Sequence, residues 1–327
     1  GFAWGVGGWL LPNFLQRAGV DAALASFPAG EMNKSLANAD RLWQACAAEG
    51  IDRSGCICAL GGGVTGDLAG FVAASWMRGI RFVQVPTSLL AMVDSSVGGK
   101  TGINSAAGKN LIGAFQQPSL VVIDTDVLVS MDAREYRAGL AEVAKYGVIR
   151  DADFLAWQED HAAALVARDA TAVAHAVATS CRIKAHYVVA DEHEHGIRAH
   201  LNYGHTFGHA LERDTGYTTY LHGEAVAIGM EMAIRAAVDL GLLTDDGLPD
   251  RQRRLLQAYD LPVRHRADDP AATVDRLVAA CLLDKKARKG KARFVLPRRI
   301  GDIALVTDPD RQLIADAFAA AIDAAAS

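Results

Sequence analysis

Three histidines lie within eighteen residues of this chain, in the stretch Leu201 to Glu224. His205 and His209 are four positions apart, so they share one face if the stretch is helical, and His222 follows after a short segment. Neutral imidazole is the commonest nitrogen ligand of zinc, and a catalytic zinc ion takes three protein ligands and keeps one position open. The stretch therefore predicts a metal site. The alternative is a buried helix whose histidines are hydrogen-bonded polar residues.

The histidine pair does not belong to a zinc protease. His205 is followed by Thr206, so the HExxH motif with its glutamate general base is missing.

A second candidate ligand lies upstream, in the apolar helical stretch Ala138 to Tyr146. Glu142 and Lys145 are its charged residues, and an unpaired charge in an apolar helix is costly. A metal ion would be a partner for Glu142, and an anionic substrate would be one for Lys145. The alternative is an ion pair between these two residues on a surface helix.

Further positive charge gathers around the predicted metal site. Lys184, Arg198 and Asn202 precede the histidines, and Asp284-Lys285-Lys286 ends a later helix. This set suggests a substrate with two or more negative groups.

A glycine turn lies between a predicted strand, Cys56 to Leu60, and a helix that begins near Leu68. Gly61, Gly63 and Gly66 satisfy the pattern GxGxxG, in which glycines let backbone amides approach a pyrophosphate at a helix N-terminus. The next strand ends in Gln84-Val85-Pro86-Thr87 and lacks the acidic residue that binds a ribose. The turn therefore indicates a nucleotide site that is not an ordinary Rossmann unit. A turn without a ligand is the alternative.

Two lysines occur in the following glycine-rich stretch, Asp94 to Gly113, which is predicted to be a flexible loop. Asp94-Ser95-Ser96-Val97-Gly98-Gly99-Lys100 and Gly108-Lys109-Asn110 offer lysine side chains as point charges for a phosphate or a carboxylate.

The elements expected around these residues form two domains. Strands at Ala22 to Phe27, Cys56 to Leu60, Arg81 to Val85 and Leu120 to Ile123 alternate with helices, which predicts a parallel sheet in residues 1–133. Residues 134–327 look helical, apart from a strand pair at Ala292 to Leu296 and Asp302 to Val306. The helices expected there are Phe154 to Arg168, Thr171 to Val189, Gly223 to Leu240, Asp250 to Tyr259, Ala271 to Leu283 and Pro309 to Ala325.

The composition excludes several classes of protein. In 327 residues, 33 Lys and Arg face 38 Asp and Glu, and a net charge of −5 gives no field to hold nucleic acid. Five cysteines without a CxxC spacing indicate reduced thiols, and no apolar run or leader indicates a membrane or secretory route, so we expect a cytoplasmic protein. The chain starts at Gly1, and we expect its N-terminus to be truncated.

The sequence resembles the 3-dehydroquinate synthase family of sugar phosphate cyclases. The resemblance rests on GGGVTGDLAGF, RGIRFVQVPTSLLAMVDSSVGGKTGIN, GKNLIGAF, AGLAEVAKYGVI, DEHEHGIRAHLNYGHTFGHALE, LHGEAVAIGM and DKK, and covers about Gly30 to Pro297. It implies an N-terminal Rossmann-like α/β domain with a parallel sheet, an all-α C-terminal domain, and an active site between them.

The resemblance also implies roles for individual residues. The zinc or cobalt ligands would be Glu142, His205 and His222, and His209 would be an active-site residue that is not a ligand. NAD would contact Glu31, Lys34, Gly62, Gly63, Val64, Asp67, Thr87, Ser88, Asp94, Ser95, Lys100 and Lys109. The substrate would meet Lys100, Asn110, Lys145, Glu194 and His209 as catalytic residues, and Lys184, Arg198, Asn202, Lys286 and, across a homodimer interface, Arg78 as binding residues.

The implied activity is the conversion of 3-deoxy-D-arabino-heptulosonate 7-phosphate into 3-dehydroquinate and phosphate in the shikimate pathway. Three alternatives are a cyclase for another sugar phosphate, a metal-dependent polyol dehydrogenase and a non-catalytic NAD-binding remnant. Sedoheptulose 7-phosphate and glucose 6-phosphate lack the carboxylate that Lys184 and Arg198 would bind, which favours the heptulosonate.

Overall fold

The computed structural model describes the backbone of residues 15–287 and 292–325, and their side chains except those of residues 282–287. It divides into two compact units, Gly1–Tyr136 and Arg137–Ser327. The division falls within helix α4 (Ala133–Arg150). None of the helices in the described part of the chain combines the length and the apolar character needed to cross a bilayer.

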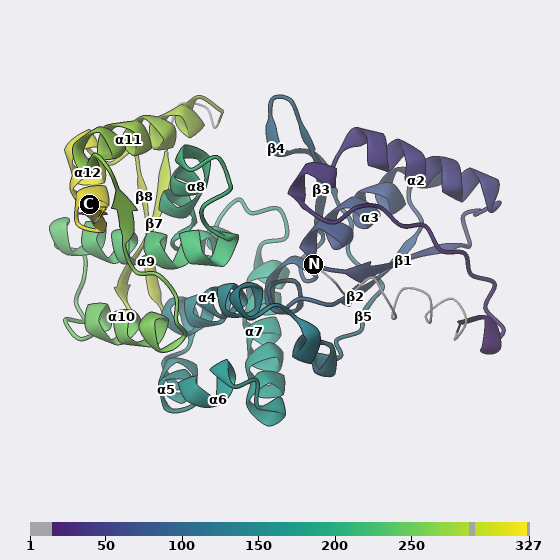
Figure 1. Cartoon of the computed structure of the whole chain (residues 1–327), viewed down its shortest axis with the longest axis horizontal. Helices are drawn as coiled ribbons and strands as arrows, with labels where there is room; N and C mark the ends of the chain where they lie inside the picture. The colour runs from purple at the N-terminus through teal and green to yellow at the C-terminus, as the bar shows by residue number, and fades with distance from the viewer. Residues whose placement is uncertain (1–14, 288–291, 326–327) are drawn as a thin grey trace. The chain divides into compact units, whose positions relative to one another are not determined.

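The first unit contains a parallel sheet of three strands in the order β1-β2-β5, shown in Figure 1. These strands are β1 (Cys56–Gly61), β2 (Arg81–Pro86) and β5 (Leu120–Val121). The predicted parallel sheet is therefore confirmed, although β5 is shorter than expected. Cys56 and Cys58 are exposed, so β1 is not the fully buried strand that its apolar sequence suggests.

Helix α3 (Gly63–Ser75) forms the core of the first unit. One side of it, with Leu68 and Val72, packs in a cluster with Ile103 and with Ala39 of α2 (Leu36–Ala48). Its other side packs on the sheet. An apolar helix that is buried on two sides fixes the glycine turn at its N-terminus to the end of β1.

The stretch from Asp94 to Gly113 is not the predicted loop. A π-helix, η3 (Ala91–Ser95), leads into an antiparallel hairpin of β3 (Lys100–Ser105) and β4 (Gly108–Phe115). Gly102 pairs with Gly113, where a Cβ would come within 2.2 Å of the Thr101 carbonyl oxygen. The glycines therefore allow two backbones to approach closely, which propensity alone does not distinguish from flexibility.

The expected strand at Ala22 to Phe27 is also wrong, because these residues have no regular structure and only Phe27 is buried, in the cluster beside α3. Three short 3-10 helices complete the unit: η1 (Glu31–Asn33), η2 (Trp76–Arg78) and η4 (Thr125–Ser130).

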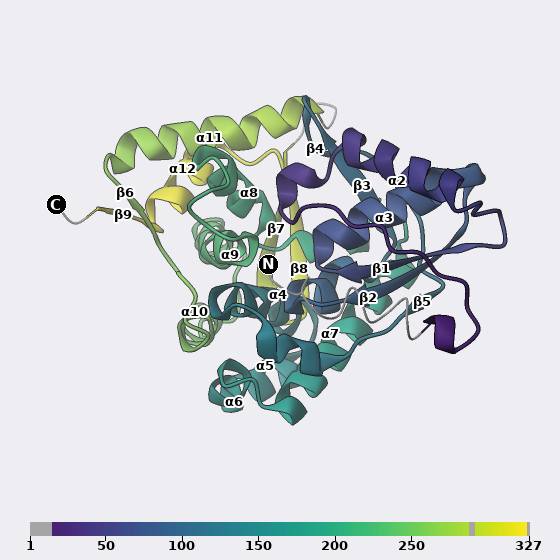
Figure 2. The ribbon, with the colours of Figure 1, turned by 45° about the vertical axis from the view of Figure 1, so that its right-hand side comes forward.

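The second unit is mainly helical, as predicted. After α4 come α5 (Ala152–Asp160), α6 (Ala162–Val166), α7 (Ala170–Ala190), the 3-10 helix η5 (Ile197–Asn202), α8 (His205–Asp214), α9 (His222–Asp239), α10 (Leu248–Ala258), α11 (Pro270–Ala287) and α12 (Arg311–Ala319). The predicted strand pair is the antiparallel hairpin of β7 (Arg293–Arg299) and β8 (Asp302–Thr307). In Figure 2, α11 runs along α8 and α12.

Two details of the second unit differ from the expectation. The helix expected from Phe154 to Arg168 is divided into α5 and α6. The expected helix from Pro309 ends at Ala319, and β9 (Ile322–Ala324) pairs in parallel with β6 (His265–Ala267). Arg264 donates two hydrogen bonds of 2.6 Å to the Asp323 carboxylate. No local sequence pattern predicts this tertiary contact.

Glycines bring α4, α8 and α9 into backbone contact. A Cβ on Gly229 of α9 would lie 2.1 Å from the Gly204 carbonyl oxygen and 2.8 Å from the Gly208 amide nitrogen. A Cβ on Gly223 would lie 1.8 Å from the carbonyl oxygen of Ala138 in α4. Real side chains do not occupy such positions, so these glycines set the distance between the three helices.

Substitution of Gly229 by Ala is therefore expected to lower the free energy of unfolding by about 1 to 3 kcal/mol, because the added methyl group meets backbone rather than flexible side chains. Gly247→Ala is the matched control, since a Cβ there meets only the Asp245 carboxylate oxygen at 3.5 Å. Urea unfolding of both variants measures the difference. Equal midpoints for the two would contradict the proposed helix contact.

Candidate functional site

Glu142, His205 and His222 converge in the second unit. Glu142 lies in the middle of α4, His205 is the first residue of α8, and His222 is the first residue of α9. One possible ligand atom from each lies within 4.8 Å of the other two. The carboxylate of Glu142 is fully buried, whereas the side chain of His222 is 30% exposed. A buried carboxylate beside two imidazoles, with one side open, has the form of a catalytic metal site.

The distances within this group fit a zinc ion. Two ligand atoms that share a tetrahedral zinc at ~2.0–2.2 Å are about 3.3–3.6 Å apart. The Nε2 atoms of His205 and His222 lie 3.3 Å and 3.9 Å from Oε1 of Glu142. The first distance matches, and the second exceeds this range by about 0.3 Å. Two nitrogen ligands and one oxygen ligand are also a donor set that zinc and cobalt accept.

Hydrogen bonds at the other ring nitrogens orient both imidazoles. Nδ1 of His205 lies 3.1 Å from the carbonyl oxygen of Tyr203. A carbonyl oxygen only accepts, so Nδ1 carries the proton and Nε2 has its lone pair available for a metal. Gly204, with a φ of 78°, turns the chain between Tyr203 and α8.

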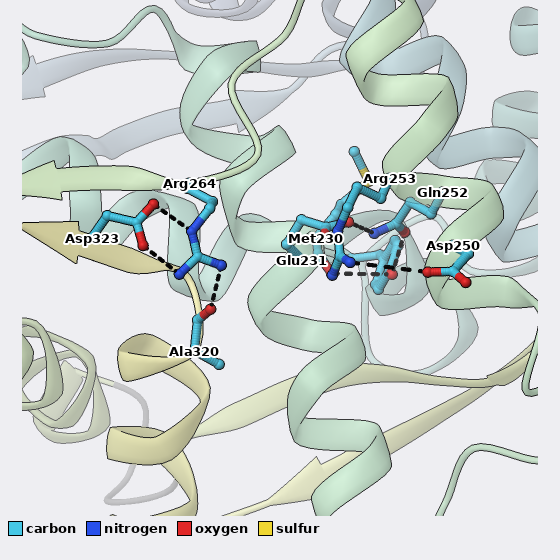
Figure 3. A network of polar contacts seen from close by, with 9 residues as sticks. Met230, Glu231, Asp250, Gln252, Arg253, Arg264, Ala320 and Asp323 are labelled. Atoms are coloured by element: carbon cyan, nitrogen blue, oxygen red, sulfur yellow. Dashed lines mark hydrogen bonds and ion pairs between the residues drawn. The ribbon is translucent and has the colours of Figure 1, made fainter.

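Tyr203 is itself fixed by a buried polar network. Its hydroxyl donates to Oε1 of Gln252 at 2.6 Å, and Nε2 of Gln252 donates to Glu231 at 3.0 Å. Arg253 donates to the other Glu231 oxygen at 2.8 Å, as the close view in Figure 3 shows. Burial and the nearby Glu231 carboxylate raise the pKa of Tyr203 well above its usual value, so its hydroxyl stays a donor. Helix α10 thus supports the backbone that orients His205.

One carboxylate contacts the His222 ring, and another caps the helix that His222 begins. Nδ1 of His222 lies 3.4 Å from Oε1 of Glu212 on α8. Glu224 accepts the Leu221 amide proton at 2.8 Å, which caps the start of α9 where His222 lies.

Lys145 and His209 border the metal group. Lys145 is buried one turn after Glu142 and forms an ion pair with its other oxygen, so the ion pair considered from sequence is present, but it is buried and not on a surface helix. His209 is exposed, and its ring centroid lies 5.5 Å from that of His205 and 5.9 Å from that of His222. Both residues are therefore next to the candidate ligands.

The residues expected to bind a carboxylate belong to α7 and the segment after it. Lys184 and Arg198 are buried, and Asn202 donates to the Glu194 carboxylate. Asp191, which sequence reasoning missed, organises this segment by accepting backbone protons from residues 195, 196 and 198 at 2.9, 2.7 and 3.1 Å. Burial opposes its ionisation, but these hydrogen bonds prevail and lower the pKa of Asp191.

In the first unit, the predicted cofactor residues gather at the carboxyl ends of β1 and β2. A Cβ on Gly62 would be 3.4 Å from the Ser88 hydroxyl oxygen, and a Cβ on Gly63 would be 3.1 Å from that of Ser95. Thr87 donates its amide proton to the Gly61 carbonyl oxygen at 2.9 Å. The glycine turn, Thr87 to Ser88 and Asp94 to Ser95 thus form one cradle at the N-terminus of α3, with Val64 in its first turn, where a nucleotide phosphate would bind.

Three further cofactor candidates form an ion-pair cluster. The buried Lys34 amine lies 3.0 Å from Asp67 and 3.1 Å from Glu31. Burial works against the charge, but the two carboxylates prevail and raise the pKa of Lys34. Lys34 is therefore a permanent cation beside the glycine turn.

The structure does not bring Lys100 and Asn110 together within the first unit. Lys100 pairs with Phe115 at one end of the hairpin, and Asn110 lies near the other end, on the order of 15 Å away along the strands. Lys109 is next to Asn110, and Arg78 is exposed after α3. Lys286 lies outside the residues whose side chains are described.

Sequence reasoning missed the residues that contact the two histidine ligands or support those contacts. Glu212 lies seven positions after His205, on the face of α8 that also carries His209, so helical spacing could have indicated it. Tyr203, Glu231 and Gln252 had no comparable signal, because they come together only in the folded unit.

Comparisons with known proteins match most of this chain to one family. Family models described as 3-dehydroquinate synthase N-terminal and C-terminal match residues 24–138 and 139–287. A 3-dehydroquinate synthase from Rhodopirellula baltica is 49% identical over 92% of this chain and 80% of its own length. One from Halorhodospira halophila is 52% identical over 90% of this chain and 81% of its own length.

Two solved structures of similar fold are described with NAD⁺ and a metal bound. A 2-epi-5-epi-valiolone synthase from Streptomyces hygroscopicus with NAD⁺ and Zn²⁺ bound is 32% identical, with a TM-score of 0.86 over 95% of this chain and 85% of the other. A 2-deoxy-scyllo-inosose synthase with carbaglucose-6-phosphate, NAD⁺ and Co²⁺ is 26% identical, with a TM-score of 0.85 over 97% and 88%. A probable glycerol dehydrogenase from Sinorhizobium meliloti, at 18% identity and a TM-score of 0.63 over 95% and 87%, shares the fold alone.

Proposed function

Because this chain belongs to the 3-dehydroquinate synthase family, we propose that it converts 3-deoxy-D-arabino-heptulosonate 7-phosphate into 3-dehydroquinate and phosphate, a step of aromatic amino acid biosynthesis. The convergence of Glu142, His205 and His222 is the structural observation that supports a metal-dependent reaction. The choice of this reaction among metal-dependent reactions rests on relatives that are 49% and 52% identical to this chain.

Glu142, His205 and His222 would hold zinc or cobalt, and the cradle of Gly62, Gly63 and Val64 with Thr87, Ser88, Asp94 and Ser95 would hold NAD, together with Glu31, Lys34, Asp67, Lys100 and Lys109. The metal would supply a Lewis acid that lowers the pKa of a substrate hydroxyl, and NAD would supply a reversible hydride acceptor for that carbon. The hydrogen bond between Nδ1 of His205 and the Tyr203 carbonyl oxygen orients Nε2 of His205 before any ligand arrives.

The remaining site residues of the second unit bind and orient the substrate. Lys184 and Arg198 would hold its carboxylate, and the Glu194 to Asn202 hydrogen bond would fix the amide beside them. Lys145 would replace its ion pair with Glu142 by a contact with the substrate, and His209 would accept or return a proton. Phosphate elimination, ring opening and aldol closure all act on this one molecule, so most of the catalysis is orientation.

The phosphate end of the substrate would be held by Lys100, Asn110 and Lys286. Since Lys100 and Asn110 lie at opposite ends of the hairpin, we propose that they contact different substrate oxygens. A homodimer in which the exposed Arg78 reaches the partner copy would complete the phosphate site. None of the five cysteines, all of which lie in the described part of the chain, forms a disulfide, which supports a reducing, cytoplasmic location.

The first test concerns the metal. Glu142→Ala and His222→Ala are each expected to lose zinc on dialysis, because a catalytic zinc depends on three protein ligands. His186→Ala, which changes an exposed histidine of α7, should keep the ion. Elemental analysis of the dialysed proteins measures this, and full zinc content in both ligand variants would refute the assignment.

The second test separates the heptulosonate from sugar phosphates without a carboxylate. Lys184→Ala and Arg198→Ala are expected to lower kcat/KM by about 10- to 150-fold, the equivalent of ~1.5 to 3 kcal/mol for a charged hydrogen bond. Arg182→Ala, an exposed change on the same helix, is the control for α7. Turnover is compared with the thermal midpoint of each variant. Undiminished kcat/KM in both would favour another cyclase activity.

The third test separates a cyclase from a polyol dehydrogenase. A cyclase returns the hydride, so a catalytic amount of NAD should support many turnovers with phosphate released in proportion to substrate consumed. The absorbance of NADH at 340 nm should therefore show no net rise. One NADH per substrate without phosphate would assign the chain to the dehydrogenases, and no turnover in a zinc-loaded protein would favour the non-catalytic remnant.

A further inference from the structure

Glu212 lies behind the candidate metal centre and has no role in the function proposed above. Its side chain is 9% exposed, and Oε1 lies 3.4 Å from Nδ1 of His222. His205, His209 and Glu212 occupy positions i, i+4 and i+7 of α8, so all three project from one face of that helix. A carboxylate is thus buried at the back of one imidazole of the metal group.

The two histidine ligands differ in how they are supported. His205 is 10% exposed and donates to a backbone carbonyl whose own residue is fixed by a buried network. His222 is 30% exposed, and its backbone starts a helix. The His222 ring therefore has less packing around it to fix its rotation, and it depends more on the hydrogen bond at Nδ1.

We propose that Glu212 is a positioning residue for the metal centre, which holds the Nδ1–H of His222 and thereby directs Nε2 toward the ion. The proposal rests on the metal ligands proposed above. A carboxylate acceptor fixes the ring tautomer and makes the imidazole a stronger ligand. Metal bound at Nε2 would in turn draw electron density from the ring and strengthen the Nδ1–H donor, which would shorten the 3.4 Å contact.

A competing use of the same atoms is a second cation site. His209, Glu212 and His222 also offer ligand atoms within 4.8 Å of one another. With the first ion at Nε2 of His222, a second ion would need Nδ1 as a ligand, and this nitrogen could not then carry the proton that Glu212 accepts. The two uses exclude each other, and the number of ions bound distinguishes them.

The experiment measures metal binding rather than turnover. Zinc affinity is determined by competition with a chromophoric chelator for the wild type, Glu212→Ala, Glu212→Gln and His222→Ala, and the Co²⁺ forms are compared by visible absorption. Glu212→Ala should bind zinc about 10- to 100-fold more weakly, with an altered Co²⁺ spectrum. Glu212→Gln should lose less, because its amide oxygen still accepts the Nδ1 proton.

Asp214→Asn is the matched control. Asp214 is on the same helix, but its carboxylate pairs with Arg276 at 2.8 Å, so zinc affinity should not change. Far-ultraviolet circular dichroism of the metal-free variants checks that they fold. If Glu212→Ala does not fold, the zinc affinity of Glu212→Gln tests the role of Glu212.

The outcomes separate this inference from the proposed metal site. Unchanged affinity and Co²⁺ spectrum in the folded Glu212 variants, while His222→Ala loses zinc, would overturn the role of Glu212 alone. Two equivalents of zinc in the wild type, with one lost in Glu212→Ala, would also overturn it in favour of a second ion. Full affinity in His222→Ala would instead overturn the ligand assignment itself.

Discussion

The close approach of α4, α8 and α9 is the constraint on which the candidate metal centre depends. Gly223 and Gly229 lie against backbone atoms of α4 and α8, at distances that leave no room for a side chain. Each helix carries one candidate ligand, and two of the ligands are first residues of their helices. The packing of backbone on backbone therefore determines where the three ligand atoms meet, and small changes in helix spacing would separate them.

Buried polar groups of the second unit surround the candidate metal centre. Glu142 is fully buried, and the ammonium group of Lys145, which forms an ion pair with one of its oxygens, compensates its charge. The Tyr203 hydroxyl connects the metal group to Gln252 and Glu231, both buried. Such a network is costly if any member is left unsatisfied, and it therefore favours one arrangement of the site. The chemistry and the stability of this unit are coupled through the same residues.

Glycines also shape the candidate site of the first unit, where they lie at a strand-to-helix turn and not between packed helices. Its glycine turn is the proposed phosphate site, where backbone amides at the start of α3 would face the anion, and the buried α3 fixes that turn to the end of β1. Lys34 adds a cation that two carboxylates keep charged. The residues proposed for the cofactor and those proposed for the metal thus belong to different units of the chain, and the proposed reaction needs both.

The sequence by itself determined the kinds of chemistry and their local positions. Spacing placed His205 and His209 on one helix face, the glycine turn followed a strand, and the buried Glu142 demanded a partner, because periodicity and the cost of an unpaired charge act within short segments. Only the tertiary structure decided that Glu142 and His222, eighty residues apart, share one point, that Asp94 to Gly113 is largely a hairpin, and that Glu212 and Tyr203 support the histidines. These contacts join segments distant in sequence, and glycine has the same local signature in a flexible loop as in a close backbone contact.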